Sequence, residues 1–181
     1  MSQKKGIHYN MIEKVVFHGS NDLHQLLQSA NQFRRSFKII DELVEVGYSK
    51  AFDGEHGFRD DIYESRYLNL AIPSIVILSF SCELQLKAII RLELNKISTG
   101  HSLLNLYKEL SDKSRTSIYS SVNAVMKDKS GYDFLEYLKN CSSVFIEWRY
   151  FHEDYRELNF KFLKAFGEAI NSRLIDIQSL S

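Results

Sequence analysis

Residues 70–94 read LAIPSIVILSFSCELQLKAIIRLEL, and this stretch decides the fold. It is apolar nearly all round between Ile72 and Ile90, which is typical of a helix that other helices surround. Proline is tolerated in the first turn of a helix and poorly tolerated in its interior, so we expect the helix either to begin near Pro73 or to kink there. The sequence therefore predicts one long central buried helix over residues 70–94.

Two charged residues, Glu83 and Lys87, interrupt this apolar run. They are four positions apart with the acid on the N-terminal side, which is the favourable orientation for an ion pair along a helix. Charged groups in apolar surroundings need partners if they are buried. We expect the two side chains to pair in a polar cluster, which Arg149 of a later helix can join.

A second helical stripe precedes this helix. Apolar residues recur at helical spacing between Leu23 and Val44, after the start signal Ser20-Asn21-Asp22 and before Gly47. The sequence predicts a helix that ends at Gly47. Its other side, which we interpret as a solvated face, carries Arg34, Arg35 and Lys38.

Further helices are expected after the central one. Residues 97–100 break the chain, His101-Ser102 opens a short helix, and another lies between Thr116 and Lys127. The last helix follows Glu157, and its apolar stripe contains Phe160, Leu163, Phe166, Ile170, Leu174 and Ile177.

Residues 132–155 carry an aromatic seam at alternating steps of four and three: Phe134, Leu138, Cys141, Phe145, Trp148, His152 and Tyr155. This spacing predicts one helix over 132–155 with all seven side chains on one face. The face must be buried against other helices or against the same face of a second chain. A two-fold homodimer would bring two copies of Arg149 and His152 near one axis.

The length of 181 residues suits one domain. With one Pro and eight Gly, the chain has little material for sheets joined by tight turns. We predict an all-α fold: an antiparallel bundle of five to six helices over residues 20–181, preceded by a polar arm over residues 1–19.

Charge and cysteine content narrow the partners and the compartment. The 23 basic and 23 acidic residues balance, so nothing forces a polyanion partner. Cys82 and Cys141 fall inside apolar helical patterns and are expected to be buried thiols of a reducing compartment. The N-terminal residues are polar and the longest apolar run is too short to span a bilayer, so we expect a cytoplasmic protein without membrane contact.

Residues 48–65 form an acidic stretch in which carboxylates and an imidazole lie close together: Asp53, Glu55, His56, Asp60 and Asp61. Their spacing matches neither a calcium loop nor a zinc site. We predict a loop without a metal, and no other segment suggests a cofactor.

Three segments in order resemble the HEPN superfamily. Residues 81–88 (SCELQLKA) are similar to its E-L-x-x-K helix, residues 99–106 (TGHSLLNL) to its G-H-x-L-x-x-L helix opening, and residues 148–153 (WRYFHE) to a W-R-Y-x-x-E variant of its late helix. The family consists of small α-helical bundles in bacterial toxins, antiphage systems and RNA-processing enzymes. The resemblance implies a HEPN-like bundle here.

The resemblance also bears on activity. In active members the late helix carries an Arg followed four to six residues later by a His, and two such helices form a metal-independent ribonuclease site across a dimer. Here only two residues separate Arg149 from His152. This departure favours a non-catalytic or degenerate module that binds nucleotide, RNA or protein in a bacterial defence or toxin–antitoxin system, with a nucleotidyltransferase-type partner. The alternative is a metal-independent endoribonuclease that uses Arg149 and His152 at the dimer interface.

Residue chemistry fits either interpretation. Arg149 could hold a phosphorane and His152 could move a proton. Glu153 or Glu83 could orient one of them, and Tyr150 could stack on a base. The structural alternatives are that Arg149 pairs with Glu153 or Glu83 and that His152 is a core or interface residue. For His101, at a helix start, we expect a capping or packing role.

Overall fold

The computed structural model describes residues 22–53, 57–58, 68–127, 131–142 and 158–180. The helices are α1 (Leu23–Ala51), a 3-10 turn η2 (Leu68–Leu70), α2 (Ala71–Leu94), α3 (Leu103–Glu109), α4 (Asp112–Met126), α5 (Phe134–Cys141) and α7 (Phe160–Ser179). The two-residue strands β1 (Phe52–Asp53) and β2 (Gly57–Phe58) pair antiparallel, with Phe52 opposite Phe58. The predicted all-α helical bundle is confirmed. The predicted arm, residues 1–19, lies outside the described residues.

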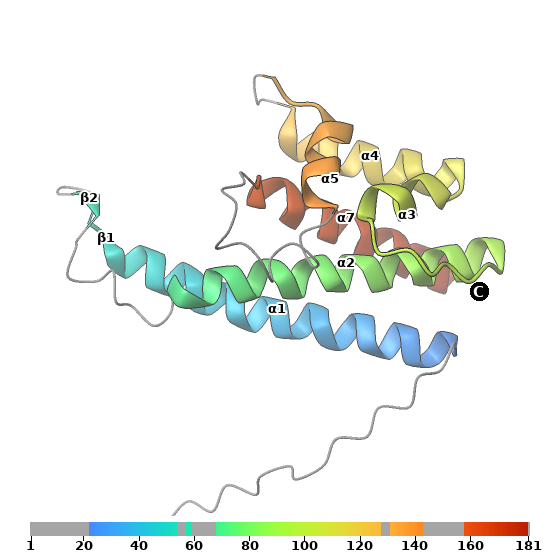
Figure 1. Ribbon diagram of the computed structural model, residues 1–181, viewed down its shortest axis with the longest axis horizontal. Coiled ribbons are helices and arrows are strands. Elements are labelled where there is room, and N and C mark those ends of the chain that lie inside the picture. The colour runs from blue at the N-terminus through green and yellow to red at the C-terminus, as the bar shows by residue number, and fades with distance from the viewer. Residues whose placement is uncertain (1–21, 54–56, 59–67, 128–130, 143–157, 181) are drawn as a thin grey trace, which may run out of the picture.

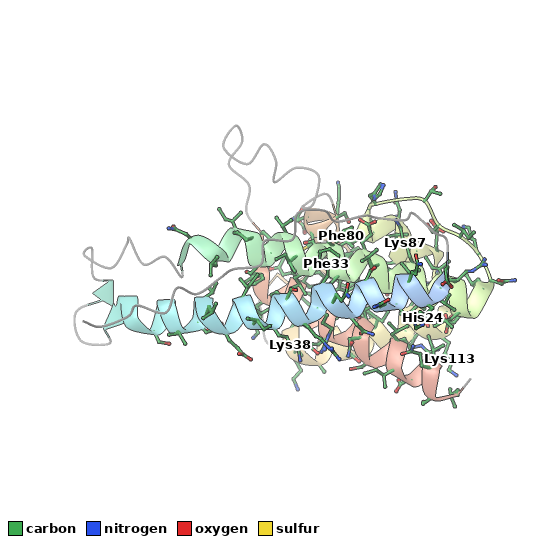
Figure 2. The ribbon with its side chains drawn as sticks, turned by 90° about the horizontal axis from the view of Figure 1, so that it is seen from below. His24, Phe33, Lys38, Phe80, Lys87 and Lys113 are labelled. Carbon is green, nitrogen blue, oxygen red and sulfur yellow. The ribbon has the colours of Figure 1, made fainter. Side chains whose placement is uncertain are left out.

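The central helix is α2. α1 runs antiparallel beside it, and α7 contacts both α2 and α4 (Figure 1). Phe33 of α1 meets Phe80 of α2 edge to face with ring centroids 4.6 Å apart (Figure 2). No helix in the described ranges is long and apolar enough to cross a membrane.

Burial along α2 is uneven. Its second half is the more enclosed, because most residues from Cys82 through Ile90 are buried and only Leu84 and Lys87 are partly exposed. In its first half, Ile72, Ile75 and Val76 are only partly buried. The predicted bounds are confirmed, and Pro73 sits in the first turn, where its missing N–H disrupts no helical hydrogen bond. The expected all-round burial is therefore approached only in the second half, which α7 and α3 contact, and even there it is incomplete at Leu84 and Lys87.

The first helix differs from the prediction in two respects. α1 continues through the buried Gly47 to Ala51, where the chain enters β1. Arg34 does not belong to a solvated face: its guanidinium bonds to the Glu168 carboxylate of α7 at 2.6 Å. The spacing of the apolar residues indicated which side chains of α1 point away from α2. It did not indicate that α7 contacts α1 on part of that face.

The predicted helix over residues 132–155 is wrong at both ends of its described part. α5 begins at Phe134, after Asp133 accepts a capping hydrogen bond from the Glu136 amide at 3.0 Å. It ends at Cys141, and the hydroxyl of the next residue, Ser142, donates to the Leu138 carbonyl at 2.7 Å and accepts from the Leu104 amide at 2.8 Å. The hydroxyl thus ties the end of α5 to the first turn of α3. Residues 143–157 lie outside the described residues, so the homodimer through this seam stays a prediction.

A buried polar network, which the sequence analysis missed, joins α2, α4 and α7. Arg173 is only 6% exposed; its Nη2 lies 2.6 Å from Oε1 of Glu93 and its Nε 2.7 Å from the Ser114 hydroxyl. The hydroxyls of Ser114 and Ser111 each donate to Glu93 at 2.7 Å. Every charge in the network has a partner, so three helices are held in one register.

Candidate functional site

Glu83 is a carboxylate inside the core. It lies in the enclosed half of α2 with 2% of its side chain exposed. Its Oε1 accepts a hydrogen bond from Nζ of Lys87, one helical turn later, at 2.8 Å. The predicted ion pair is therefore confirmed, and it resolves the conflict between a charge and its apolar surroundings.

His101 joins this pair from a different segment. Asn95 adopts a left-handed conformation (φ 49°) that ends α2, and the chain then returns along the helix toward α3. This return places Nδ1 of His101 2.9 Å from the same Oε1 of Glu83. The cap of α3 is Ser102, whose hydroxyl accepts from the Asn105 amide, and the His101 side chain is 57% exposed. The expected capping role of His101 is therefore wrong, because Ser102 is the residue that caps α3.

The hydrogen-bonding capacity of this cluster is only partly used. An ionised carboxylate only accepts, so Nδ1–H of His101 donates to Glu83, and Nε2 of His101 has no hydrogen-bond partner among the described residues. The Lys87 ammonium has three N–H groups, of which Glu83 takes one and no other described residue takes a second, and its side chain is 15% exposed. Lys87 and His101, which can both form further hydrogen bonds, are therefore partly exposed beside one buried carboxylate.

Oε2 of Glu83 has a different environment. It is buried and has no hydrogen-bond partner in the described part of the chain. A buried charged oxygen without a donor is costly, so this atom marks a place where a further donor would stabilise the protein.

The structure brings together three of the predicted site residues: Glu83, Lys87 and His101. The others, Arg149, Tyr150, His152 and Glu153, lie outside the described residues. Sequence reasoning named both Glu83 and His101 but did not pair them. The available signal was that they occupy the first and second of the three segments that resemble one family.

The acidic stretch is described only in part. Asp53 belongs to β1, whereas Glu55, His56, Asp60 and Asp61 lie outside the described residues. Within the residues that are described, no group of three or more His, Cys, Asp or Glu side chains is arranged to hold a metal ion.

Comparison with known proteins identified no relative of this chain. No protein-family model matches the chain, and neither a curated protein nor a solved structure matches it. The HEPN resemblance therefore remains a prediction that rests on its three segments.

Proposed function

We propose that this protein is a HEPN-like module that binds RNA or nucleotide through phosphate and ribose contacts at Lys87 and His101, without cleaving RNA. The observation that carries the proposal is the shared Oε1 of Glu83, which accepts from both side chains at 2.8 and 2.9 Å, while the side chain of His101 is 57% exposed and that of Lys87 15% exposed. A buried carboxylate of this kind restricts two side chains before a ligand arrives. Less conformational entropy is then lost on binding.

The chemistry of the free atoms suits this ligand class. The Lys87 ammonium offers donors to phosphate oxygens. Nε2 of a charged His101 donates to a phosphate, and Nε2 of a neutral His101 accepts from a ribose 2′-hydroxyl. Glu83 balances one of the two cations, so a charged His101 gives the cluster a net positive charge that favours an anion.

Arg149 is proposed as the third cation of this cluster. The buried Oε2 of Glu83 supports this role, because it lacks a donor in the described residues and a guanidinium is a strong donor to carboxylate. If Arg149 supplies it, Arg149→Ala lowers the melting temperature more than Arg59→Ala, a substitution in the acidic stretch. Equal effects of the two substitutions would argue against the role.

Binding is tested with fluorescently labelled single-stranded RNA by anisotropy at several salt concentrations. Lys87→Gln is expected to weaken binding and to reduce the slope of log affinity against log salt by about one contact. His101→Gln is expected to weaken binding too, whereas Lys161→Gln, an exposed lysine of α7, serves as the matched control. Unchanged affinity in both site variants would refute the proposed site.

Cleavage is tested in the same preparation with EDTA present. We expect no metal-independent cleavage. In active family members the His lies four to six positions after the Arg, whereas His152 lies three positions after Arg149. Because each position turns a helix by about 100°, this difference points the imidazole in another direction. Cleavage by the wild type that both Arg149→Ala and His152→Ala abolish, with the fold intact, would establish the endoribonuclease instead.

The biological setting remains part of the proposal. The homodimer proposed through residues 132–155 rests on the part of that seam after Cys141, because Phe134, Leu138 and Cys141 are buried within one chain. Light scattering at micromolar concentration tests it. The resemblance supports a role in a toxin–antitoxin or antiphage system with a nucleotidyltransferase-type partner, and the polar N-terminal residues support a cytoplasmic location. Growth arrest on overexpression that depends on Arg149 would favour the toxin interpretation over simple binding.

A further inference from the structure

A hollow of about 480 Å³ lies where α3, α4 and the start of α5 meet. Its lining includes the aromatic residues Tyr107, Tyr119, Tyr132 and Phe134, together with the polar residues Asn123 and Asp133. None of the three residues of the Glu83 cluster lines it. Its size falls in the range of small-molecule sites, and its walls are mostly aromatic.

The floor of the hollow is rigid. Phe134 is buried, and its ring centroid lies 5.6 Å from that of Phe162 in the core. Tyr107 is also buried, lies 5.2 Å from Phe134, and donates its hydroxyl hydrogen bond to the Arg115 carbonyl at 3.0 Å. Two neighbours on other elements therefore hold these rings in place without a ligand.

Tyr119 forms an exposed wall. Its ring packs against Phe134 at 5.3 Å, with the planes inclined by 71°, yet the residue is 45% exposed. A large aromatic ring that is fixed along one side and open to solvent is a surface on which a second flat ring can stack.

The polar atoms around the hollow have spare capacity. The Asn123 side chain makes no hydrogen bond within the described residues, so it offers both a donor and an acceptor. Asp133 uses Oδ1 to cap α5, and its second oxygen remains an acceptor. The Tyr132 hydroxyl is buried without a partner in the same part of the chain, and burial raises its pKa to about 12, so it keeps its proton.

We propose that this hollow binds a nucleobase with an exocyclic amino group, and adenine best, by stacking it on Tyr119. An asparagine amide can make two hydrogen bonds to the amino group and N7 of adenine, and a carboxylate oxygen accepts from an amino group. Aromatic stacking accepts any base, so Asn123 and Asp133 supply the selectivity. The proposal goes beyond phosphate and ribose binding at Lys87 and His101, because it concerns a separate site and a different part of a nucleotide.

Adenosine is the probe, because it has no phosphate. Its ribose could still contact His101, so His101→Ala is included and is expected to bind adenosine like the wild type, which separates failure of this site from failure of the proposed function. A titration of the wild type, followed by protein and ligand NMR signals, is expected to saturate. Inosine, which has a carbonyl in place of the amino group, is expected to bind about tenfold more weakly. Lys87→Gln is expected to bind adenosine like the wild type even if it loses RNA.

Variants of the lining complete the test. Tyr119→Ala should weaken adenosine binding about tenfold, and Tyr119→Phe, which keeps the ring and its packing on Phe134, should retain it. Asn123→Ala should reduce the preference for adenosine over inosine, and the part that remains is assigned to Asp133. Val125→Ala, an exposed position of α4 that does not line the hollow, is the control.

Three results would overturn the proposal. They are absence of saturable adenosine binding to the wild type, equal binding to a folded Tyr119→Ala, or indole binding as tightly as adenosine. The last would show an aromatic pocket that does not read a base edge.

Discussion

Arg173 of α7 and Glu93 of α2 stand 80 positions apart in the chain, and their guanidinium and carboxylate meet at 2.6 Å. Because both side chains are largely buried, neither charge can recover its hydration if the other is removed. Removing one partner of a buried pair costs about 3–5 kcal/mol.

We therefore expect Arg173→Ala to lower the free energy of unfolding by about 3 kcal/mol. The measurement is urea unfolding followed by circular dichroism. Arg34→Ala is the control, because its partner Glu168 is 55% exposed and such pairs contribute less than about 1 kcal/mol. Equal losses in the two variants would mean that burial of the Arg173 pair does not determine its contribution.

The same network predicts a pH dependence. Burial raises the pKa of Glu93, but hydrogen bonds from Ser111, Ser114 and Arg173 outweigh it, so this pKa lies below its ordinary value of 4.5. A carboxyl whose pKa is lower in the folded state stabilises the fold above the unfolded value, and this stabilisation is lost as the pH falls through the folded value. Wild type should therefore exceed Glu93→Gln in unfolding free energy at pH 7, and the gap should shrink below about pH 4.5.

Urea unfolding of both proteins between pH 7 and pH 3 measures that gap. Glu42→Gln, at an exposed position of α1, controls for the general effect of removing a carboxylate. A gap that stays constant over this range would show that the charge of Glu93 is not what stabilises the network.

The contact between α7 and α2 depends on Gly167. A Cβ atom there would lie 3.0 Å from Cδ1 of Leu78 and 3.3 Å from Sγ of Cys82, so the two helices approach closely only because this side chain is missing. Overpacking of this kind costs about 1–3 kcal/mol. We expect Gly167→Leu to lower the unfolding free energy by that amount, although leucine favours a helix more than glycine does.

Gly100→Leu is the matched control, because no atom lies within 4 Å of a Cβ at that exposed position. Its unfolding free energy should stay within about 0.5 kcal/mol of wild type. A Gly167→Leu protein as stable as this control would mean that α7 can shift away from α2 without loss.

The two cysteines are expected to be inert in the folded protein. Both are buried, which confirms that prediction, and burial raises the pKa of both thiols, that of Cys141 to about 12. Since the thiolate is the reactive form, a water-soluble disulfide reagent at neutral pH should label neither native thiol. Both thiols should react in denaturant, and rapid labelling of either before unfolding would contradict the buried placement.

Much of the helical framework follows from the sequence alone. α2 was predicted over residues 70–94 and spans Ala71–Leu94, because its apolar content and its Pro73 are local signals. The stripe of α7 was also predicted, and so was the pairing of Glu83 with Lys87, since positions four apart on a helix always face the same side.

Tertiary structure alone decided which distant residues meet. His101 lies 18 positions from Glu83, and the hydroxyl of Ser142, at the end of α5, accepts from the amide of Leu104, 38 positions earlier. Periodicity determines which residues share one face of one helix, but not which face of another helix it meets. That choice is made by the packing of all the helices together, so the pairing of Arg173 with Glu93 and the meeting of His101 with Glu83 became visible only in the folded chain.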